Sequence, residues 1–437
     1  MALIHEKSCE SVHTGLDLFS IPPTQTAVME GMWVEYHPLA ILSPSAPISF
    51  SISGNTQEYI DFANTALHIK AKITNADGSD IANDAGVFPV NYWMHSLFSQ
   101  VDVTLNDTLV TPSENTYPYR AYIEALINYS REAKQGHLSS ALFYRDSANH
   151  FEDVQGDENK GMKTRQELTS RSREVDMMGR LHVDFFHQER YMLNGVDVKI
   201  KLTPSKSEFN LMGPSPFPDY RSVITHASLF VRKVKLNPAV SLAHAKTLEK
   251  GTAKYPLKRV VVRTFSIPRG NLSAIQDNLF LSQTPTRLVI GLVSSAAFNG
   301  RSAANPFNFR TFGLTYLSLF LDGKAVPASP LTPQYGDHLS IRAYYGLMSA
   351  VGMVNKDQGN FLERRDHALG NTLYAFDLTP SLLDDCNVFE LVKTAALRLE
   401  LKFAEGLPEP VTVILYGEQD SVVEIDRTRQ VLTDFSQ

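Results

Sequence analysis

Cysteine is scarce in this sequence. The 437 residues include only Cys9 and Cys386, which lie far apart and match no disulfide or metal-ligand spacing. This usage fits a reducing compartment, and it means that packing alone must hold the fold together.

Long apolar runs are also missing. No stretch of about 18 consecutive apolar residues occurs, and the N-terminal sequence MALIHEKSCESVHTG has no apolar core of the kind found in secretory signals. We therefore expect neither a signal peptide nor a membrane span.

Positive charge is not in excess. Lys and Arg number 41 against 47 Asp and Glu, the net charge is -6, and residues 1–30 contain one lysine and no arginine. Proteins that hold nucleic acid by neutralising phosphates usually carry a basic arm or stripe. Direct or sequence-specific nucleic-acid binding is therefore not expected.

Sequence signatures of catalysis are absent too. The chain has no G-x-G-x-x-G, no G-x-x-x-x-G-K followed by Ser or Thr, no H-E-x-x-H, no G-x-S-x-G and no paired C-x-x-C. We assign no catalytic, cofactor-binding or metal-binding residue, expect no cofactor, and expect that the protein is not an enzyme.

Three polar clusters are the candidates that could contradict that assignment. HVDFFHQE offers His182, Asp184, His187 and Glu189, but in a strand His187 would point away from the face shared by His182 and Asp184, which disfavours a metal site. The mixed charges of NKDQGNFLERRDH are more typical of a solvated face or an interface salt-bridge cluster than of acid/base catalysis, and they comprise Asp357, Glu363, Arg364, Arg365 and Asp366. A solvated or subunit-facing strand edge is expected to carry Arg232, Lys233 and Lys235.

What the sequence does have is length and apolar content. Hydrophobic residues make up 43% and aromatic residues 10%, and 437 residues exceed what one ordinary core holds. We therefore expect two large domains.

The two halves of the chain echo each other in order. Each pair alone is weak, but the common order and a shared change from strand to helix spacing favour a tandem duplication over two unrelated β domains. One of the pairs shares a hairpin turn of residues that tolerate positive φ, Asn106-Asp107 in 98–112 and Asp322-Gly323 in 314–327. The pairs are 50–55 with 265–271, 59–73 with 277–293, 98–112 with 314–327, 119–127 with 341–348, 181–186 with 373–378, 196–202 with 397–403, and 227–236 with 411–425.

Short alternating strands dominate both halves. VDVKIKL and LRLELKF alternate apolar and polar residues as half-buried strands do, and long helices are missing. The size of each half suits a jelly roll of about eight strands, so we expect an all-β double jelly roll with short helices in loops and linker. The expected domains are an extended arm (1–40), a first jelly roll (41–236), a helical linker (237–256), a second jelly roll (257–426) and a tail (427–437).

Two further segments are expected to lie outside the strands of the jelly rolls. Residues 145–176 are polar and poor in apolar periodicity, which predicts a long exposed loop in the first jelly roll, either merely solvated or in contact with a receptor or neighbour. The N-terminal arm is interrupted by Pro22 and Pro23, and its apolar side chains need a surface to cover, either on the same domain or on a neighbour. These residues, expected outside the strands, are Leu16, Leu18, Phe19, Ile21, Val28, Met32 and Trp33. The segment 425–437 is a similar candidate.

Several long phrases carry a resemblance to a known family. LDLFSIPPTQTAV, WVEYHPLA, HSLFSQVDVTLN, NTYPYRAYIEALINYS, LFVRKVKLNPAVSLAHAKTLEKGTAKYP, IPRGNLS, NPFNFR and VEIDR look like the major capsid protein of Polinton (Maverick) elements and adintoviruses. The resemblance runs from about residue 14 to the end and is loosest in 145–176.

The resemblance implies a double jelly-roll capsid protein of the adenovirus-hexon and large DNA virus lineage. Such chains form homotrimeric, pseudo-hexagonal capsomers that tile an icosahedral shell of a DNA virus or virus-like transposon, and their partners include a penton-type single jelly-roll protein, a packaging ATPase and a maturation protease. The implied location is the virion capsid, after synthesis in the host cytoplasm and with the nucleus as a candidate place of assembly. The family has no catalytic residues to carry over.

Two other functions stay open. A bicupin-like metal-dependent enzyme would also double a β-barrel, but the H-x-H followed by Glu that it needs is not found in either half. A lectin-like β-sandwich binding protein would be a stable monomer.

Overall fold

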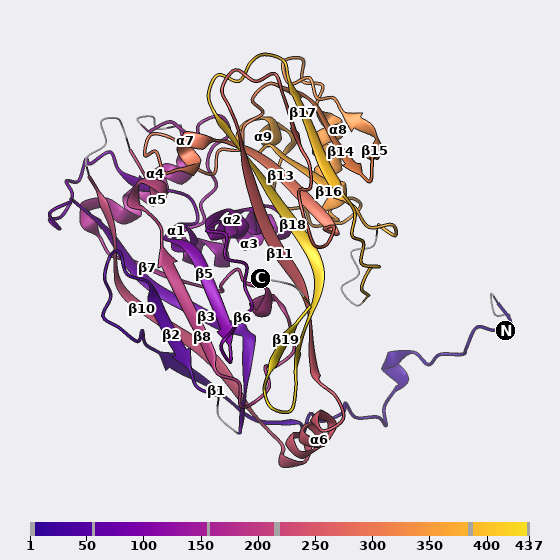
Figure 1. Cartoon of the computed structure of the whole chain (residues 1–437). Coiled ribbons are helices and arrows are strands. Elements are labelled where there is room, and N and C mark those ends of the chain that lie inside the picture. The colour runs from indigo at the N-terminus through magenta and orange to yellow at the C-terminus, as the bar shows by residue number, and fades with distance from the viewer. Residues whose placement is uncertain (1–4, 55–56, 155–157, 214–218, 383–387, 435–437) are drawn as a thin grey trace.

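The computed structural model describes residues 5–54, 57–154, 158–213, 219–382 and 388–434. Cys386 lies outside these residues. Two β-sandwiches follow each other along the chain, and short helices lie in the connections (Figure 1). Among the described residues, no helix combines the length and apolarity needed to cross a bilayer.

The first sandwich consists of two antiparallel 4-stranded sheets. In spatial order, one contains β1 (Val28–Tyr36), β10 (Arg221–Leu236), β3 (Glu58–Thr74) and β7 (Val175–Gly179). The other contains β2 (Ile48–Ile52), β8 (Val198–Pro204), β5 (Phe98–Leu105) and β6 (Thr108–Leu109). A small extra ladder pairs β4 (Phe88–Pro89) with β9 (Leu211–Met212).

The second sandwich repeats this plan. One sheet contains β11 (Ala253–Ile267), β18 (Val411–Ile425), β13 (Arg287–Ser294) and β16 (Leu373–Asp377), and β19 (Val431–Thr433) adds to β18. The other contains β12 (Ser273–Gln276), β17 (Leu397–Phe403), β14 (Leu314–Leu321) and β15 (Lys324–Leu331).

The two halves share one connectivity. With β4, β9 and β19 set aside, each sandwich has a sheet in the order first, eighth, third and sixth strand, and a sheet in the order second, seventh, fourth and fifth. This is the connectivity of an eight-stranded jelly roll. The predicted double jelly roll is confirmed.

The sequence repeat matches this repeat of strands, with two exceptions. The phrase 50–55 begins within β2 and the phrase 265–271 begins within β11, so that pair joins a second strand to a first strand. Residues 181–186 come after β7, whereas residues 373–378 contain its counterpart β16. These two pairings are wrong, because short β-rich phrases resemble each other by composition; the remaining pairs join equivalent elements. Both predicted turns form, with positive φ at Asn106, Asp107, Asp322 and Gly323.

Burial follows the alternation of side chains along the strands. In β8, Val198, Ile200 and Leu202 are buried while Lys199 and Lys201 are exposed. Such alternation is typical of a sheet with one face on a core and the other toward solvent.

The sheet of β11, β18, β13 and β16 instead lies between two cores. In β13, Leu288, Ile290 and Leu292 belong to the core of the second jelly roll, whereas Val289 and Val293 belong to the larger core that continues into the first. A sheet buried on both faces needs a nearly continuous apolar run, and RLVIGLVS provides it. The two jelly rolls thus share a packed boundary.

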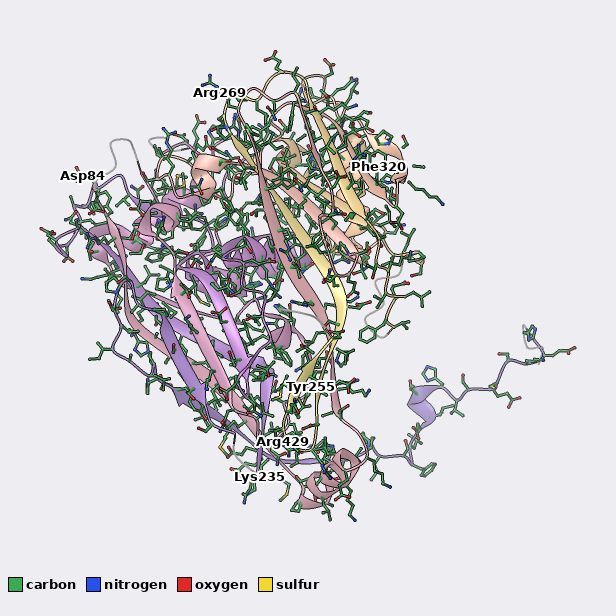
Figure 2. The ribbon with its side chains drawn as sticks, viewed as in Figure 1. Asp84, Lys235, Tyr255, Arg269, Phe320 and Arg429 are labelled. Carbon is green, nitrogen blue, oxygen red and sulfur yellow. The ribbon has the colours of Figure 1, made fainter. Side chains whose placement is uncertain are left out.

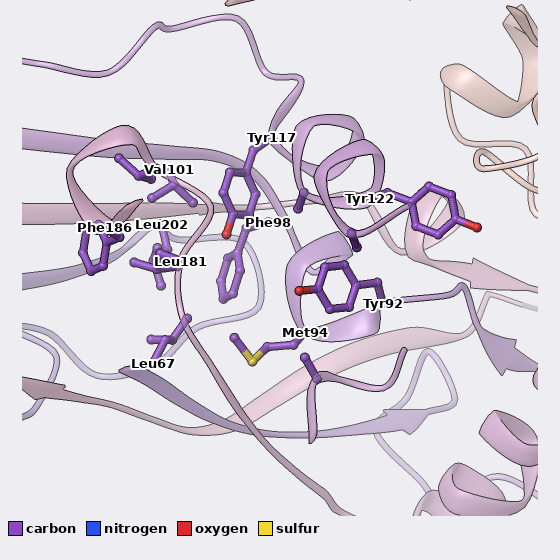
Figure 3. Packing of buried hydrophobic residues seen from close by; sticks show 14 of the residues in the cluster. Leu67, Tyr92, Met94, Phe98, Val101, Tyr117, Tyr122, Leu181, Phe186 and Leu202 are labelled. Carbon is purple, nitrogen blue, oxygen red and sulfur yellow. The ribbon is translucent and has the colours of Figure 1, made fainter. Parts of the chain in front are cut away.

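Helices occupy that boundary and the outer connections (Figure 1). Residues of α2 belong to the larger core, together with side chains from strands of both halves. Figure 3 shows part of this core. The helices are α1 (Trp93–Ser96), α2 (Tyr117–Asn128), α3 (Arg131–Gln135), α4 (Lys160–Thr169), α5 (Ser207–Asn210), α6 (Pro238–Leu248), α7 (Ser295–Phe298), α8 (Ile341–Ala350) and α9 (Arg364–Ala368). Short 3-10 turns are η1 (Thr14–Leu16), η2 (His137–Ala141), η3 (Ser170–Ser172) and η4 (Asp184–His187).

The prediction of an exposed loop over 145–176 is wrong for much of that segment. It contains α4, and the side chain of Arg165 is fully buried. The Arg165 guanidinium donates to the carbonyls of Pro89 at 3.0 Å and Tyr144 at 2.7 Å, and to Asp146 at 2.7 Å. Because one buried arginine and not an apolar stripe anchors the helix, apolar periodicity could not reveal it.

Both terminal segments contribute a strand to the body of the molecule. Val28, Met32 and Trp33 lie in β1, which pairs with β10, so their placement outside the strands is wrong. At the other end β19 pairs with β18, and Arg429, labelled in Figure 2, donates to the Asn194 carbonyl at 2.7 Å. The C-terminal segment therefore covers its own chain as far as Asp434.

Candidate functional site

A buried ionic cluster lies on α2, where the two jelly rolls meet. Arg120 donates to Glu124 Oε1 at 2.9 Å and to Asp184 Oδ1 at 2.6 Å. Glu124 Oε2 also lies 2.6 Å from His182 Nδ1. Arg120 and Glu124 are four residues apart and therefore share one face of the helix. We call these four residues the boundary cluster.

The second jelly roll completes this cluster. The backbone N–H of Val260 in β11 donates to Asp184 Oδ1 at 3.2 Å. The Tyr416 hydroxyl of β18 lies 3.1 Å from Glu418 Oε1 and 3.4 Å from Glu124 Oε1. Charged groups from the first half thus find partners in the second, which fixes the position of one jelly roll against the other.

A lysine makes a similar connection beyond the end of α2. Lys134 of α3 donates through Nζ to the carbonyls of Leu126 at 2.7 Å and Asn360 at 2.5 Å. Burial lowers the pKa of Lys134 to about 7. Its hydrogen bonds join α2 and α3 to the segment before α9.

Opposite charges compensate one another in the boundary cluster. Burial opposes the ionisation of Glu124, but Arg120 and the hydrogen bond from His182 outweigh it, and the pKa of Glu124 falls well below its usual range. Burial raises the pKa of Asp184, and Arg120 opposes that rise. Removal of the single arginine would leave two buried carboxylates without their cation.

Neutral aromatic groups surround the charges. Tyr92 Oη lies 2.8 Å from His182 Nε2, and His95 Nδ1 lies 2.9 Å from Tyr117 Oη. Burial, followed by the proximity of His182, lowers the pKa of His95 well below its usual value. His95 therefore stays neutral near pH 7.

Three residues at this place could offer ligands to a metal ion. One atom each from Glu124, His182 and His187 lies within 4.8 Å of the others. The expectation that His187 would point away is wrong, because residues 184–187 form the 3-10 turn η4 and not a strand. Glu189 is exposed and is not in this group.

The chemistry of the group nevertheless disfavours a cation. Both ring nitrogens of His182 already face partners, Glu124 and Tyr92. Glu124 is occupied by His182 and by Arg120, whose positive charge would repel a metal ion. The arrangement suits a structural ion pair and not a metal centre.

The charged segment 355–367 is a contact with the first half of the chain. Asp366 and Glu363 form the capping box of α9, and Arg145 pairs with Asp366 and, at 3.9 Å, with Glu363. The Arg145 guanidinium also lies over the ring of Phe361, 4.3 Å from its centroid. Arg364, Arg365 and Asp357 are exposed.

The basic residues of β10 differ among themselves. Arg232 lies 3.5 Å from Asp61 and over the ring of Trp33. Lys233 is buried and lies 3.1 Å from Glu58, so the expectation of a solvated or subunit-facing position is wrong for it. Lys235 is exposed, as Figure 2 illustrates.

The N-terminal arm presents its apolar side chains to solvent. Phe19 is 96% and Ile21 88% exposed, and Leu16 and Leu18 are exposed as well. Figure 1 shows the arm extending away from both jelly rolls before it enters β1. Exposed apolar residues on an extended arm favour contact with another molecule.

The boundary cluster was not foreseen from the sequence. The available signal was the pair of charged residues, four apart, inside the otherwise apolar helix sequence YRAYIEALI. Charged residues are rarely buried without a partner, so Arg120 and Glu124 indicated each other. Asp184 and His182 could not be added, because η4 was not foreseen.

Comparisons with known proteins agree with the fold. No family model matches the sequence. A Caenorhabditis elegans protein described as uncharacterized is 26% identical over 431 residues, which cover 95% of this chain and 99% of that protein.

Solved viral structures share the architecture over nearly the whole chain. A chain of the Sputnik virophage, solved by cryo-EM, has a TM-score of 0.65 and 11% identity, with 99% of this chain and 94% of that chain covered. The Faustovirus major capsid protein has a TM-score of 0.59 and 10% identity, with coverages of 94% and 92%. The mavirus major capsid protein has a TM-score of 0.56 and 11% identity, with coverages of 100% and 97%.

Proposed function

We propose that this chain is a structural protein, the major capsid protein of a DNA virus or virus-like transposon of the Polinton (Maverick) and adintovirus kind. The observation that carries the proposal is the repetition of one jelly-roll connectivity within a single chain. The fold shared with viral capsid proteins supports it.

A duplicated jelly roll is suited to a shell. Three copies of a chain with two similar domains place six similar domains around one threefold axis, and closed cyclic symmetry then repeats the same contacts around the ring. The resulting pseudo-hexagonal capsomer can tile an icosahedral surface with its neighbours. The boundary cluster would hold the two jelly rolls of one chain at a constant relative position in every capsomer.

The remaining partners follow from the same role. The exposed N-terminal arm would cover a neighbouring subunit, and a penton-type single jelly-roll protein would occupy the vertices. The location would be the virion capsid, after synthesis in the host cytoplasm and with assembly there or in the nucleus. The net charge of -6 gives the chain no general attraction for nucleic acid.

The oligomeric state of the purified chain tests the proposal. Size-exclusion chromatography with light scattering should give a mass of about three chains, in keeping with a closed homotrimer. A persistent monomer whose behaviour changes with added sugars would support a lectin-like protein instead. Elemental analysis with stoichiometric iron, manganese or zinc would support a bicupin-like enzyme and contradict the capsid role.

A further inference from the structure

Two helices occupy the same place in the two jelly rolls but differ in exposure. Both α2 and α8 lie between the fifth and sixth strands of their jelly roll, after β6 and β15 respectively. From Tyr117 to Ile127, every residue of α2 is buried. In α8, Ile341 is 48% and Tyr345 58% exposed, and Leu339 just before the helix is 63% exposed.

The second jelly roll is what covers α2. Tyr119 stacks on Phe298 with ring centroids 5.3 Å apart, and Tyr122 stacks on Phe307 at 4.2 Å. Tyr416 of β18 reaches Glu124 of the same helix. The covering surface is therefore the face of β11, β18, β13 and β16 turned away from the second core, together with the segment that follows β13.

The first jelly roll has a counterpart of that covering surface. By the shared connectivity it is the outward face of β1, β10, β3 and β7. Trp33 and Arg232 are directly opposite each other in the ladder and lie on this face, since Val231 beside Arg232 points into the core. Trp33 is 53% and Met178 39% exposed, and Phe230 also lies on this side of β10, beside the ring of His68.

We propose that α8 of one chain docks on the outward face of β1, β10, β3 and β7 of a second copy, as α2 docks on the matching face within the chain. The inference rests on the proposed function, because it requires that copies of this chain meet in a ring. α8 and the sheet of β1, β10, β3 and β7 lie on opposite sides of the molecule (Figure 1). A contact between two different surfaces is head-to-tail and closes into a ring when the rotation permits.

The exposed chemistry of the two surfaces fits this contact. Ile341 and Tyr345 are four residues apart and therefore present one apolar patch on one side of α8, and exposed Leu339 comes just before the helix. Trp33, Phe230 and Met178 offer aromatic and apolar partners, the residue types enriched at the centres of interfaces. Aligning 119–127 with 341–348 places Gly346 where α2 has Glu124, so the contact between copies needs no buried carboxylate there.

Two double variants test the pairing of these surfaces. The helix variant carries Ile341→Glu with Tyr345→Glu, and the sheet variant carries Trp33→Glu with Met178→Glu. The control is Leu242→Glu on α6, at a position 57% exposed. All are compared with the wild-type chain by circular dichroism, for folding, and by light scattering, for mass.

The expected masses are about three chains for the wild type and the control, and about one chain for each double variant. An equimolar mixture of the two double variants should form a species of about two chains, since one intact helix face and one intact sheet face remain. Tyr345→Ala, a milder change, should weaken association by about tenfold or more.

Other outcomes separate the two proposals. A trimeric wild type with double variants that stay trimeric would overturn the docking surface and leave the capsid role standing. A mixture that stays monomeric would overturn the pairing of α8 with the sheet, and so would a control that dissociates like the double variants. A wild type that is monomeric at every concentration would overturn the capsid role itself.

Discussion

The two jelly rolls share a connectivity but not an environment. The sheet of β11, β18, β13 and β16 is buried on both faces, whereas its counterpart of β1, β10, β3 and β7 keeps one face toward solvent. In the same way α2 is covered and α8 is half exposed. Equivalent elements therefore differ according to whether the chain itself supplies their neighbour.

The equivalent arginines illustrate the consequence. Arg120 on α2 is buried and holds two carboxylates, one of them in η4. Arg342 on α8 is exposed and donates to the carbonyls of Ser329 at 2.6 Å and Pro330 at 2.8 Å. The equivalent arginine of the repeat is therefore buried among carboxylates where the two jelly rolls meet and exposed to solvent where they do not.

The strongest test of this contrast substitutes the two arginines. Arg120→Ala should lower the free energy of unfolding by about 3–5 kcal/mol, because it leaves Glu124 and Asp184 buried without their cation. Arg342→Ala should cost less than about 1 kcal/mol, since its partners can turn to water. Urea unfolding measures both, and Trp93, fully buried in the first jelly roll, supplies the fluorescence signal. Equal losses would contradict the contrast.

A second test adds one methyl group to the middle sheet. A Cβ on Gly291 would lie 2.5 Å from Phe309 Cδ1, so Gly291→Ala should lower stability by about 1–3 kcal/mol through overpacking. The matched change is Lys70→Ala on the outward side of β3, which should alter stability by less than about 0.5 kcal/mol. Thermal unfolding compares them, and a neutral Gly291→Ala would show that this face is not tightly covered.

The pH dependence of stability should also differ between the two jelly rolls, with a smaller effect than the substitutions above. Burial keeps the pKa of His95 well below 6.5 in the folded chain. Between that lowered pKa and pH 6.5, His95 therefore binds a proton in the unfolded chain but not in the folded chain. Stability should therefore fall as pH drops below about 6.5, by up to about 1.4 kcal/mol per pH unit for this group.

The variant His95→Gln should flatten that slope. His367 in the second jelly roll is buried too, but the Leu373 carbonyl opposes the fall of its pKa, so His367→Gln should flatten the slope less. Urea unfolding at pH 7, 6 and 5 measures both variants. A greater flattening from His367→Gln would reverse the expected order.

A further substitution, on α8, is expected to be slightly stabilising. Gly346 lies inside α8, and a Cβ there would meet nothing within 4 Å. Gly346→Ala should raise the stability of the isolated chain by up to about 1 kcal/mol, because alanine favours the helix and restricts the unfolded chain. A loss of stability in thermal unfolding would show that α8 is more crowded than the exposure of Tyr345 indicates.

Much of the fold could be predicted from local patterns. Strands such as β8 and β17 alternate apolar and polar residues, and the repeated order of strands, turns and one short helix indicated the duplication. The strand β1 was missed because Pro22 and Pro23 directed attention to an extended arm, although Met32, Val34 and Tyr36 alternate as strand residues do. The helix α4 within 145–176 was missed because hydrogen bonds of Arg165 anchor it.

The boundary cluster could be predicted from the sequence only in part. Arg120 and Glu124 are visible as a pair on one helix face, but their partners come from η4 and from β18, which tertiary packing alone brings to them. The apolar periodicity of the sequence describes one helix or strand at a time. Contacts between elements of different repeats depend on how the repeats are placed, and no local pattern encodes that.

The central claim is that the duplicated jelly rolls let three identical chains close into one ring. Electron microscopy of the purified protein tests it most directly. We expect particles with threefold symmetry and a six-sided outline, in which the jelly rolls of neighbouring chains alternate around the axis. Averages that show single two-lobed chains, or particles of another symmetry, would contradict it.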